Sequence, residues 1–84
     1  SPYILVRDDA HDDLSARELK DRIARHIHDL PADQRSLFLL HKEFNKTYEE
    51  IAENTGLSSR TVRRKIKAIV DNLITILRNE GFIE

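Results

Sequence analysis

Gly56 constrains this chain more than any other residue, because it separates two segments that each begin with a helix-capping residue. Thr47 and Glu50 have the spacing of a capping box, in which the hydroxyl accepts from a free backbone amide and the carboxylate reaches back to another. Gly56 can adopt the left-handed conformation that ends a helix without steric cost. Ser58 can then cap a new helix. The spacing therefore predicts two helices joined by a tight turn.

The two helices over residues 48–67 meet the requirements of a helix-turn-helix, in which a turn of three or four residues joins two steeply crossed helices. Such a crossing needs a small residue where the helices approach, and Ala52 meets that need. Leu57 and Val62 are apolar and can anchor the second helix to the core. We therefore predict that the second helix presents its amino end to solvent, with backbone amides available to a phosphate.

The rest of the chain is expected to complete one small domain. At 84 residues it has room for one modest core, and 39% hydrophobic with 35% charged residues favours folding over disorder. Residues 1–13 hold a short apolar run followed by four aspartates, which we interpret as an acidic linker. Residues 14–84 are predicted to form an all-α, four-helix domain. Because the sequence lacks an initiator methionine, we expect it to be a piece of a longer protein.

The other helices are expected from apolar periodicity and from breaks. The first begins near Ser15, which has a glutamate three residues later, and ends before Pro31, since the residue preceding a proline is pushed out of helical geometry. The second runs from Pro31 to near Phe44, and its four consecutive apolar residues predict burial. The fourth continues to Gly81 and carries, over residues 69–77, more apolar surface than we expect the other helices to cover.

Positive charge gathers at the start of the fourth helix, although the net charge of the chain is -1. Val62 marks the inward direction of this helix. At about 100° per residue, Arg60, Arg64 and Lys67 then lie near the opposite face. Lys65 lies nearer the core side and is assigned to a phosphate contact or to packing along its stem. The helix therefore predicts an outward cationic face.

This face is suited to double-stranded DNA, because arginine can read guanine bidentately in the major groove while neighbouring cations bind phosphates. We expect Arg35 to be structural, as the partner of a carboxylate such as Glu50. The candidate DNA-binding residues are the loop, cap and recognition-helix side chains Lys46, Thr47, Ser58, Ser59, Arg60, Thr61, Arg63, Arg64, Lys65 and Lys67.

Other classes of protein are not supported. The sequence has no glycine-rich phosphate loop, nucleophile elbow or His-Glu metal helix, so we expect no enzyme and no catalytic residue. Cysteine is absent, and His26 and His28 face different ways on a helix, so we expect no metal and no cofactor. No apolar run approaches the roughly 18 residues of a membrane span, and no signal peptide is evident. We expect a soluble, cytoplasmic protein without membrane contact.

Residues 30–73 carry a family resemblance. Its most specific parts are Leu30-Pro31 with Gln34-Arg35, then Tyr48-Glu49-Glu50-Ile51-Ala52, and finally Gly56-Leu57-Ser58 with Thr61-Val62. The stretch resembles region four of bacterial sigma factors, particularly those of the extracytoplasmic-function type. The acidic segment and helix before it also look like the connection between regions two and four in that family.

The resemblance implies recognition of the minus-35 promoter element as part of RNA polymerase, in transcription initiation. It assigns base reading to Arg63, Arg64 and Lys67, and backbone contacts to Arg60 and Lys65. It also implies docking on the flap of the polymerase beta subunit, for which the apolar residues of the fourth helix are the candidate surface, and sequestration by an anti-sigma factor.

Two alternatives stay open at this point. Many sigma factors carry an arginine and alanine pair where this chain has Ala68-Ile69, and the very apolar residues 69–77 resemble the dimer helix of LuxR-type regulators, which share the helix-turn-helix outline. Leu30-Pro31 and the helix before it favour the sigma factor. The second alternative is a protein-interaction module, in which residues 69–77 are the functional surface and the cations only keep the chain in solution.

Overall fold

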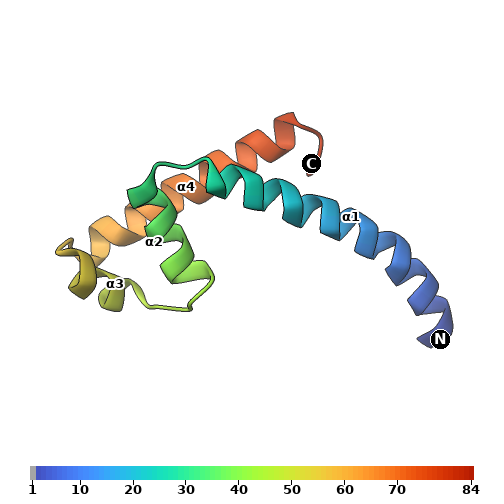
Figure 1. Ribbon diagram of the computed structural model, residues 1–84, viewed down its shortest axis with the longest axis horizontal. Helices are drawn as coiled ribbons and strands as arrows, with labels where there is room; N and C mark the ends of the chain where they lie inside the picture. Colours follow the sequence, from blue (N-terminus) through green and yellow to red (C-terminus); the bar gives the residue numbers. More distant parts are fainter. Residues whose placement is uncertain (1) are drawn as a thin grey trace.

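Four helices make up the fold in a computed structural model, which describes the backbone of residues 2–84 and the side chains of residues 14–84. In chain order they are α1 (Pro2–His28), α2 (Ala32–Lys42), α3 (Tyr48–Thr55) and α4 (Ser59–Asn79). Figure 1 shows α2, α3 and the start of α4 grouped together, while the end of α1 lies beside the second half of α4. No strand occurs between residues 2 and 84, so the predicted all-α class is confirmed.

The first helix differs from the prediction because it begins at Pro2 and not near Ser15. Proline suits the first turn of a helix, and no glycine or further proline interrupts the chain before residue 31. The capping-box spacing at Ser15 is therefore overridden by an uninterrupted helical segment. The division into a linker over residues 1–13 and a domain over residues 14–84 stays a prediction.

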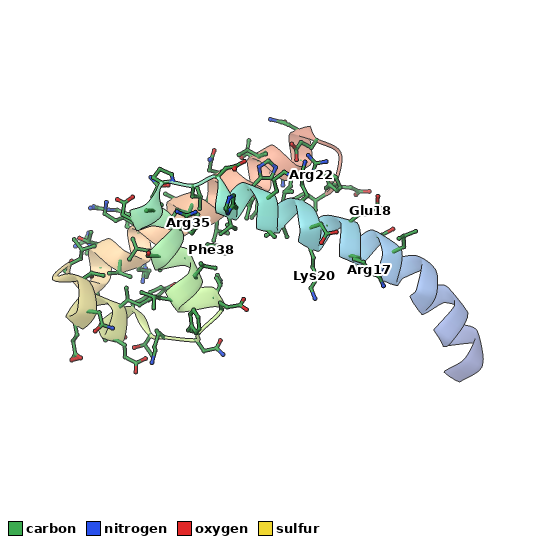
Figure 2. All side chains as sticks on the ribbon, in the orientation of Figure 1. Arg17, Glu18, Lys20, Arg22, Arg35 and Phe38 are labelled. Carbon is green, nitrogen blue, oxygen red and sulfur yellow. The ribbon has the colours of Figure 1, made fainter. Side chains whose placement is uncertain are left out.

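The junction between α1 and α2 follows the proline, as predicted. Pro31 has φ -53° and ψ 148°, an extended conformation from which α2 begins at Ala32. Arg35 on α2 donates from Nη1 to the carbonyl oxygen of His28 at 2.9 Å, and Figure 2 shows it where the two helices meet. The predicted pairing of Arg35 with Glu50 is wrong. The carbonyl groups in the last turn of α1 have no helical donors, and Arg35 donates to one of them.

The helix-turn-helix has the predicted caps. The amide of Glu50 donates to Thr47 Oγ1 at 3.0 Å, and the amide of Thr47 donates to the Glu50 carboxylate at 2.8 Å. Gly56 ends α3 with φ 76°, and its amide donates to the carbonyl of Ala52 at 2.9 Å. Ser58 caps α4. These local contacts fix where α3 ends and α4 begins.

A first core cluster holds the helix-turn-helix together. It joins one residue of α2, one of α3 and two of α4, namely Leu37, Ile51, Val62 and Ile66. Ile51 and Val62 are 0% exposed. Ala52 and Leu57 pack against this cluster, as the helix-turn-helix prediction requires. The first turns of α4 are thereby fixed against α3, with the opposite side of the helix left to solvent.

A second core cluster covers the later part of α4. Its buried members are Ile27 of α1 with Leu73 and Leu77 of α4. Phe38 of α2 packs against them, as do Phe82 and Ile83 after α4. The expected surplus of apolar surface over residues 69–77 is therefore largely wrong, because α1 and the end of the chain cover it.

Polar contacts close the edge of the second cluster. Glu80 lies 2.9 Å from His26 Nε2 and 3.7 Å from Arg22 Nη1, both on α1. The Arg22 guanidinium also lies 5.0 Å from the centre of the Phe82 ring. These contacts join α1 to the segment after α4. Among residues 2–84, no helix is both long and apolar enough to cross a membrane.

Candidate nucleic-acid interface

The amino end of α4 is fixed by Ser58. Its Oγ accepts from the amide of Thr61 at 3.1 Å and donates to Thr61 Oγ1 at 2.9 Å. The amides of Ser59 and Arg60 precede the first donor of the helical ladder and point along the helix axis, where a phosphate oxygen can accept from them. The hydroxyls of Ser58 and Thr61 are engaged with each other, so a direct DNA contact by either stays a prediction.

Five cations lie in the first half of α4. They are Arg60, Arg63, Arg64, Lys65 and Lys67, and all five are exposed. Val62 and Ile66, on the other side of the same turns, are 0% and 2% exposed. The predicted outward orientation of Arg60, Arg64 and Lys67 is therefore confirmed, while the contacts of all five cations with DNA stay predictions.

A shallow hollow lies where the amino ends of α3 and α4 come together. Tyr48 and Glu49 line it from α3, and Ser59, Arg60 and Arg63 line it from α4. Because Tyr48 and Ser59 are the first residues of their helices, the positive ends of two helix dipoles point to the same region. Together with two arginines they favour an anion such as a DNA phosphate.

Sequence reasoning missed the contribution of Tyr48 and Glu49 to this hollow. Both follow the Thr47 cap directly, so their place at the amino end of α3 was available from the sequence. What the sequence does not give is the approach of the two helix ends, which depends on packing of Ile51 against Val62. Glu49 is the one carboxylate lining the hollow.

The two lysines of α4 occupy different surroundings. Lys65 lines a groove toward α2, together with Asp33, Gln34 and Ala68, which agrees with its assignment nearer the core side. Lys67 Nζ lies 3.3 Å from a carboxylate oxygen of Asp71, one turn further along α4. The side chains of Lys67 and Asp71 are 72% and 61% exposed, so solvent screens the attraction between them. Lys67 remains able to reach a phosphate.

The loop before α3 carries the remaining predicted residues, Lys46 and Thr47, which are both exposed. The Lys46 amide donates to the carbonyl of Leu40 at 2.9 Å, and the Lys46 carbonyl accepts from His41 Nδ1 at 2.9 Å. The backbone of this loop is therefore tied to the end of α2. His41 was not predicted to take part, because its contact joins two elements and leaves no periodic pattern.

One ionisable group of the interface has a shifted pKa. The backbone amide of Thr47 lowers the pKa of the Glu50 carboxyl below its usual 4.5 by donating to it. Desolvation is the next largest effect and acts in the opposite direction, while the Thr47 hydroxyl and the charge of Lys46 add smaller lowering effects. The charged carboxylate therefore belongs to the folded form of the capping box.

Two histidines make polar contacts within the protein. His26 contacts Glu80, and His41 contacts the Lys46 carbonyl. Within the part of the chain that the structure describes, no three His, Cys, Asp or Glu side chains lie close enough together to hold a metal ion.

Comparison with known proteins gives one family. The family described as Sigma-70, region 4 matches residues 20–72, a range that includes the end of α1, all of α2 and α3, and most of α4. Comparisons with curated proteins and with solved structures gave no match. The matched range contains the residues that line the hollow and the five exposed cations in the first half of α4.

Proposed function

The chain belongs to the Sigma-70, region 4 family of DNA-binding domains from promoter-binding sigma factors, and from this premise we propose that it recognises the minus-35 promoter element as part of an extracytoplasmic-function sigma factor. The observation that carries the proposal is the capped amino end of α4, with exposed cations beside the amino end of α3. The family is a DNA-binding one and not a catalytic one. The match also favours a sigma factor over a LuxR-type regulator.

The geometry supports different roles for different residues, with some binding phosphates and others reading bases. A phosphate oxygen in the hollow would accept from the amides at the start of α4 and pair with Arg60. Arg63 and Arg64 lie one turn further along, at the height where a recognition helix contacts base edges in the major groove. Lys46, in the loop before α3, would bind a second phosphate. Phosphate contacts would set the register in which the arginines read bases.

The proposal is tested by titrating a labelled promoter duplex at several salt concentrations. Four to six phosphate contacts predict that the logarithm of the binding constant falls against the logarithm of salt with a slope of about -0.9 per contact. Arg63→Ala is expected to weaken binding by about 5- to 100-fold and to relax base preference at one position. Arg17→Ala, an exposed arginine of α1, is the matched control. A flat salt dependence would contradict DNA binding.

The family also implies an interaction with RNA polymerase, for which the structure offers a different surface from the one expected. Because the second cluster covers the later part of α4, we propose that the flap of the beta subunit docks in the mainly apolar groove between α1 and α2. Ile23 and Ala24 of α1 and Phe38 and Leu39 of α2 line this groove, and Figure 2 shows Phe38 on the side of α2 that faces α1. Sequestration by an anti-sigma factor stays a prediction from the resemblance.

Docking in this groove is tested by a substitution that fills it without touching the core. Ala24 is exposed, so Ala24→Glu keeps a good helix former and places a charge among apolar side chains. We expect it to abolish binding to the isolated flap while leaving the melting temperature and DNA affinity unchanged. Ala16→Glu, on the same helix outside the groove, is the control. Equal binding by both variants would refute the assignment.

A further inference from the structure

The loop that carries Lys46 is held from two consecutive residues of α2. Leu40 accepts from the Lys46 amide at 2.9 Å, and the ring of His41 contacts the Lys46 carbonyl at 2.9 Å through Nδ1. A carbonyl oxygen can only accept, so Nδ1 carries a hydrogen and donates it. Both backbone groups of Lys46 are therefore engaged, and the point from which its side chain extends is held against α2.

The same histidine also supports the first residue of α3. The rings of His41 and Tyr48 are stacked, with their centres 4.5 Å apart and their planes 23° from parallel. Tyr48 lines the hollow with Arg60 and Arg63. His41 thus contacts the residues on both sides of the Thr47 cap, one by a hydrogen bond and the other by its ring face.

The loop reaches this arrangement through a reversal at Asn45. Its φ of 56° lies in the left-handed region, which asparagine tolerates better than most residues. The reversal brings the Lys46 carbonyl back over the last turn of α2, within reach of His41. The contact is therefore part of how the chain enters the helix-turn-helix.

We propose that His41 is a positioning residue for DNA binding, which holds the loop so that Lys46 and the amino end of α3 meet neighbouring phosphates without reordering. The proposal rests on the proposed DNA-binding function and adds to it a residue that does not itself touch DNA. Its physical basis is pre-organisation, because a loop that is already ordered loses less conformational entropy on binding.

Two variants separate the two contacts of His41. His41→Phe keeps an aromatic ring against Tyr48 and removes the donor to Lys46. We expect it to weaken binding to the promoter duplex about fivefold, the effect of losing one neutral hydrogen bond. We also expect the salt slope to become shallower by about 0.9, because the Lys46 contact is lost. His41→Gln keeps a donor and should recover part of the salt slope. His28→Ala, an exposed histidine of α1, is the control.

A double-mutant cycle distinguishes positioning from a general loss of stability. In the His41→Phe background, Lys46→Ala should cause no further loss of affinity, whereas Arg64→Ala should cause its full loss. Full additivity of His41→Phe with Lys46→Ala, at an unchanged melting temperature, would overturn this inference while leaving DNA binding intact. If the unmodified protein failed to bind the duplex, the proposed function and this inference would both be overturned.

Discussion

Gly56 shows how much a single residue decides in this fold. Its φ of 76° places the turn between α3 and α4 in the left-handed region, and no heavy atom outside Gly56 and its two chain neighbours lies within 4 Å of the position that a Cβ would take. The requirement for glycine is therefore a backbone requirement and not one of space. The angle between the two helices, and with it the hollow between their amino ends, depends on this turn.

We predict that Gly56→Ala lowers the free energy of unfolding by about 1 kcal/mol, because an L-residue in the left-handed region is disfavoured by that order. Urea denaturation followed by circular dichroism measures the change. Gly56→Asn should lose less, since asparagine is the next most common residue at this cap position. Unchanged stability in Gly56→Ala would show that the turn relaxes to another conformation.

Glu50 gives the capping box a pH dependence whose direction follows from its lowered pKa. A carboxyl group with a pKa lowered by folding stabilises the fold at pH values above its unfolded value, near the usual 4.5. This contribution is lost as the pH falls through the folded value. Glu50→Gln keeps an acceptor for the Thr47 amide but removes the charge. The melting temperatures of the two proteins should therefore differ most near neutral pH and converge as the pH falls below the folded pKa of Glu50. A constant difference would exclude a role for the charge.

Side chains that act on neighbours in sequence were predictable, and those that act across elements were not. The caps at Thr47 and Ser58 satisfy amides within three residues, so spacing alone identifies them. Arg35 had several possible acceptors, and the choice of the His28 carbonyl depends on where α1 ends. His41 also acts across elements, because its partners Lys46 and Tyr48 lie after the reversal at Asn45.

At the scale of elements, α4 combines a buried side with a cationic side, and the cationic side ends at a carboxylate. Asp71 lies one turn after Lys67 and pairs with it at 3.3 Å. Both groups are exposed, so the pair adds little to stability. It does place a negative charge next to the last cation of the proposed DNA face, where phosphates would approach.

We predict that Asp71→Asn raises DNA affinity severalfold and steepens the salt slope by up to about 0.9, because it frees Lys67 and removes repulsion of phosphate. Asp21→Asn changes the net charge equally but lies on α1, and serves as the matched control. Titrations of both variants with one duplex at fixed salt make the comparison. If the two variants gained equally, the effect would belong to net charge and not to the face of α4.

Element boundaries were predictable where a residue forces them. Pro31 and Gly56 end helices at the expected places, because each imposes a backbone geometry. The start of α1 was predicted wrongly, near Ser15 instead of at Pro2, because a capping pattern does not tell whether a helix continues through it. The covering of residues 69–77 was missed for a related reason, since the covering side chains come from α1 and from the end of the chain.

At the scale of the whole molecule, two apolar clusters share one helix. The first fixes α3 against the start of α4, and the second fixes α1 against its later turns. α1 therefore contributes to stability without lining the hollow between α3 and α4. This separation means that the stability of the domain and its DNA affinity can be altered by different substitutions.

We predict that Ile27→Ala lowers the free energy of unfolding by about 2–4 kcal/mol, the usual cost of truncating a buried aliphatic side chain. Leu14→Ala on the same helix should change it by less than about 0.5 kcal/mol, because Leu14 is 55% exposed. Thermal and urea denaturation of both variants measure the difference. A similar loss of stability in the two variants would mean that α1 is packed along more of its length than the part that contributes to the second cluster.

Because both clusters include residues of α4, a small rotation of this helix at the second cluster moves its amino end. From Leu73 to Arg60 the helix extends about 20 Å, so a tilt of about 5° at the second cluster displaces the arginine by nearly 2 Å. That is more than the roughly 0.5 Å within which a binding constellation has to be held. A protein that bound between α1 and α2 and tilted α4 by this amount would therefore change base reading from a distance. By thermodynamic reciprocity, the duplex would change the affinity for that protein by the same factor.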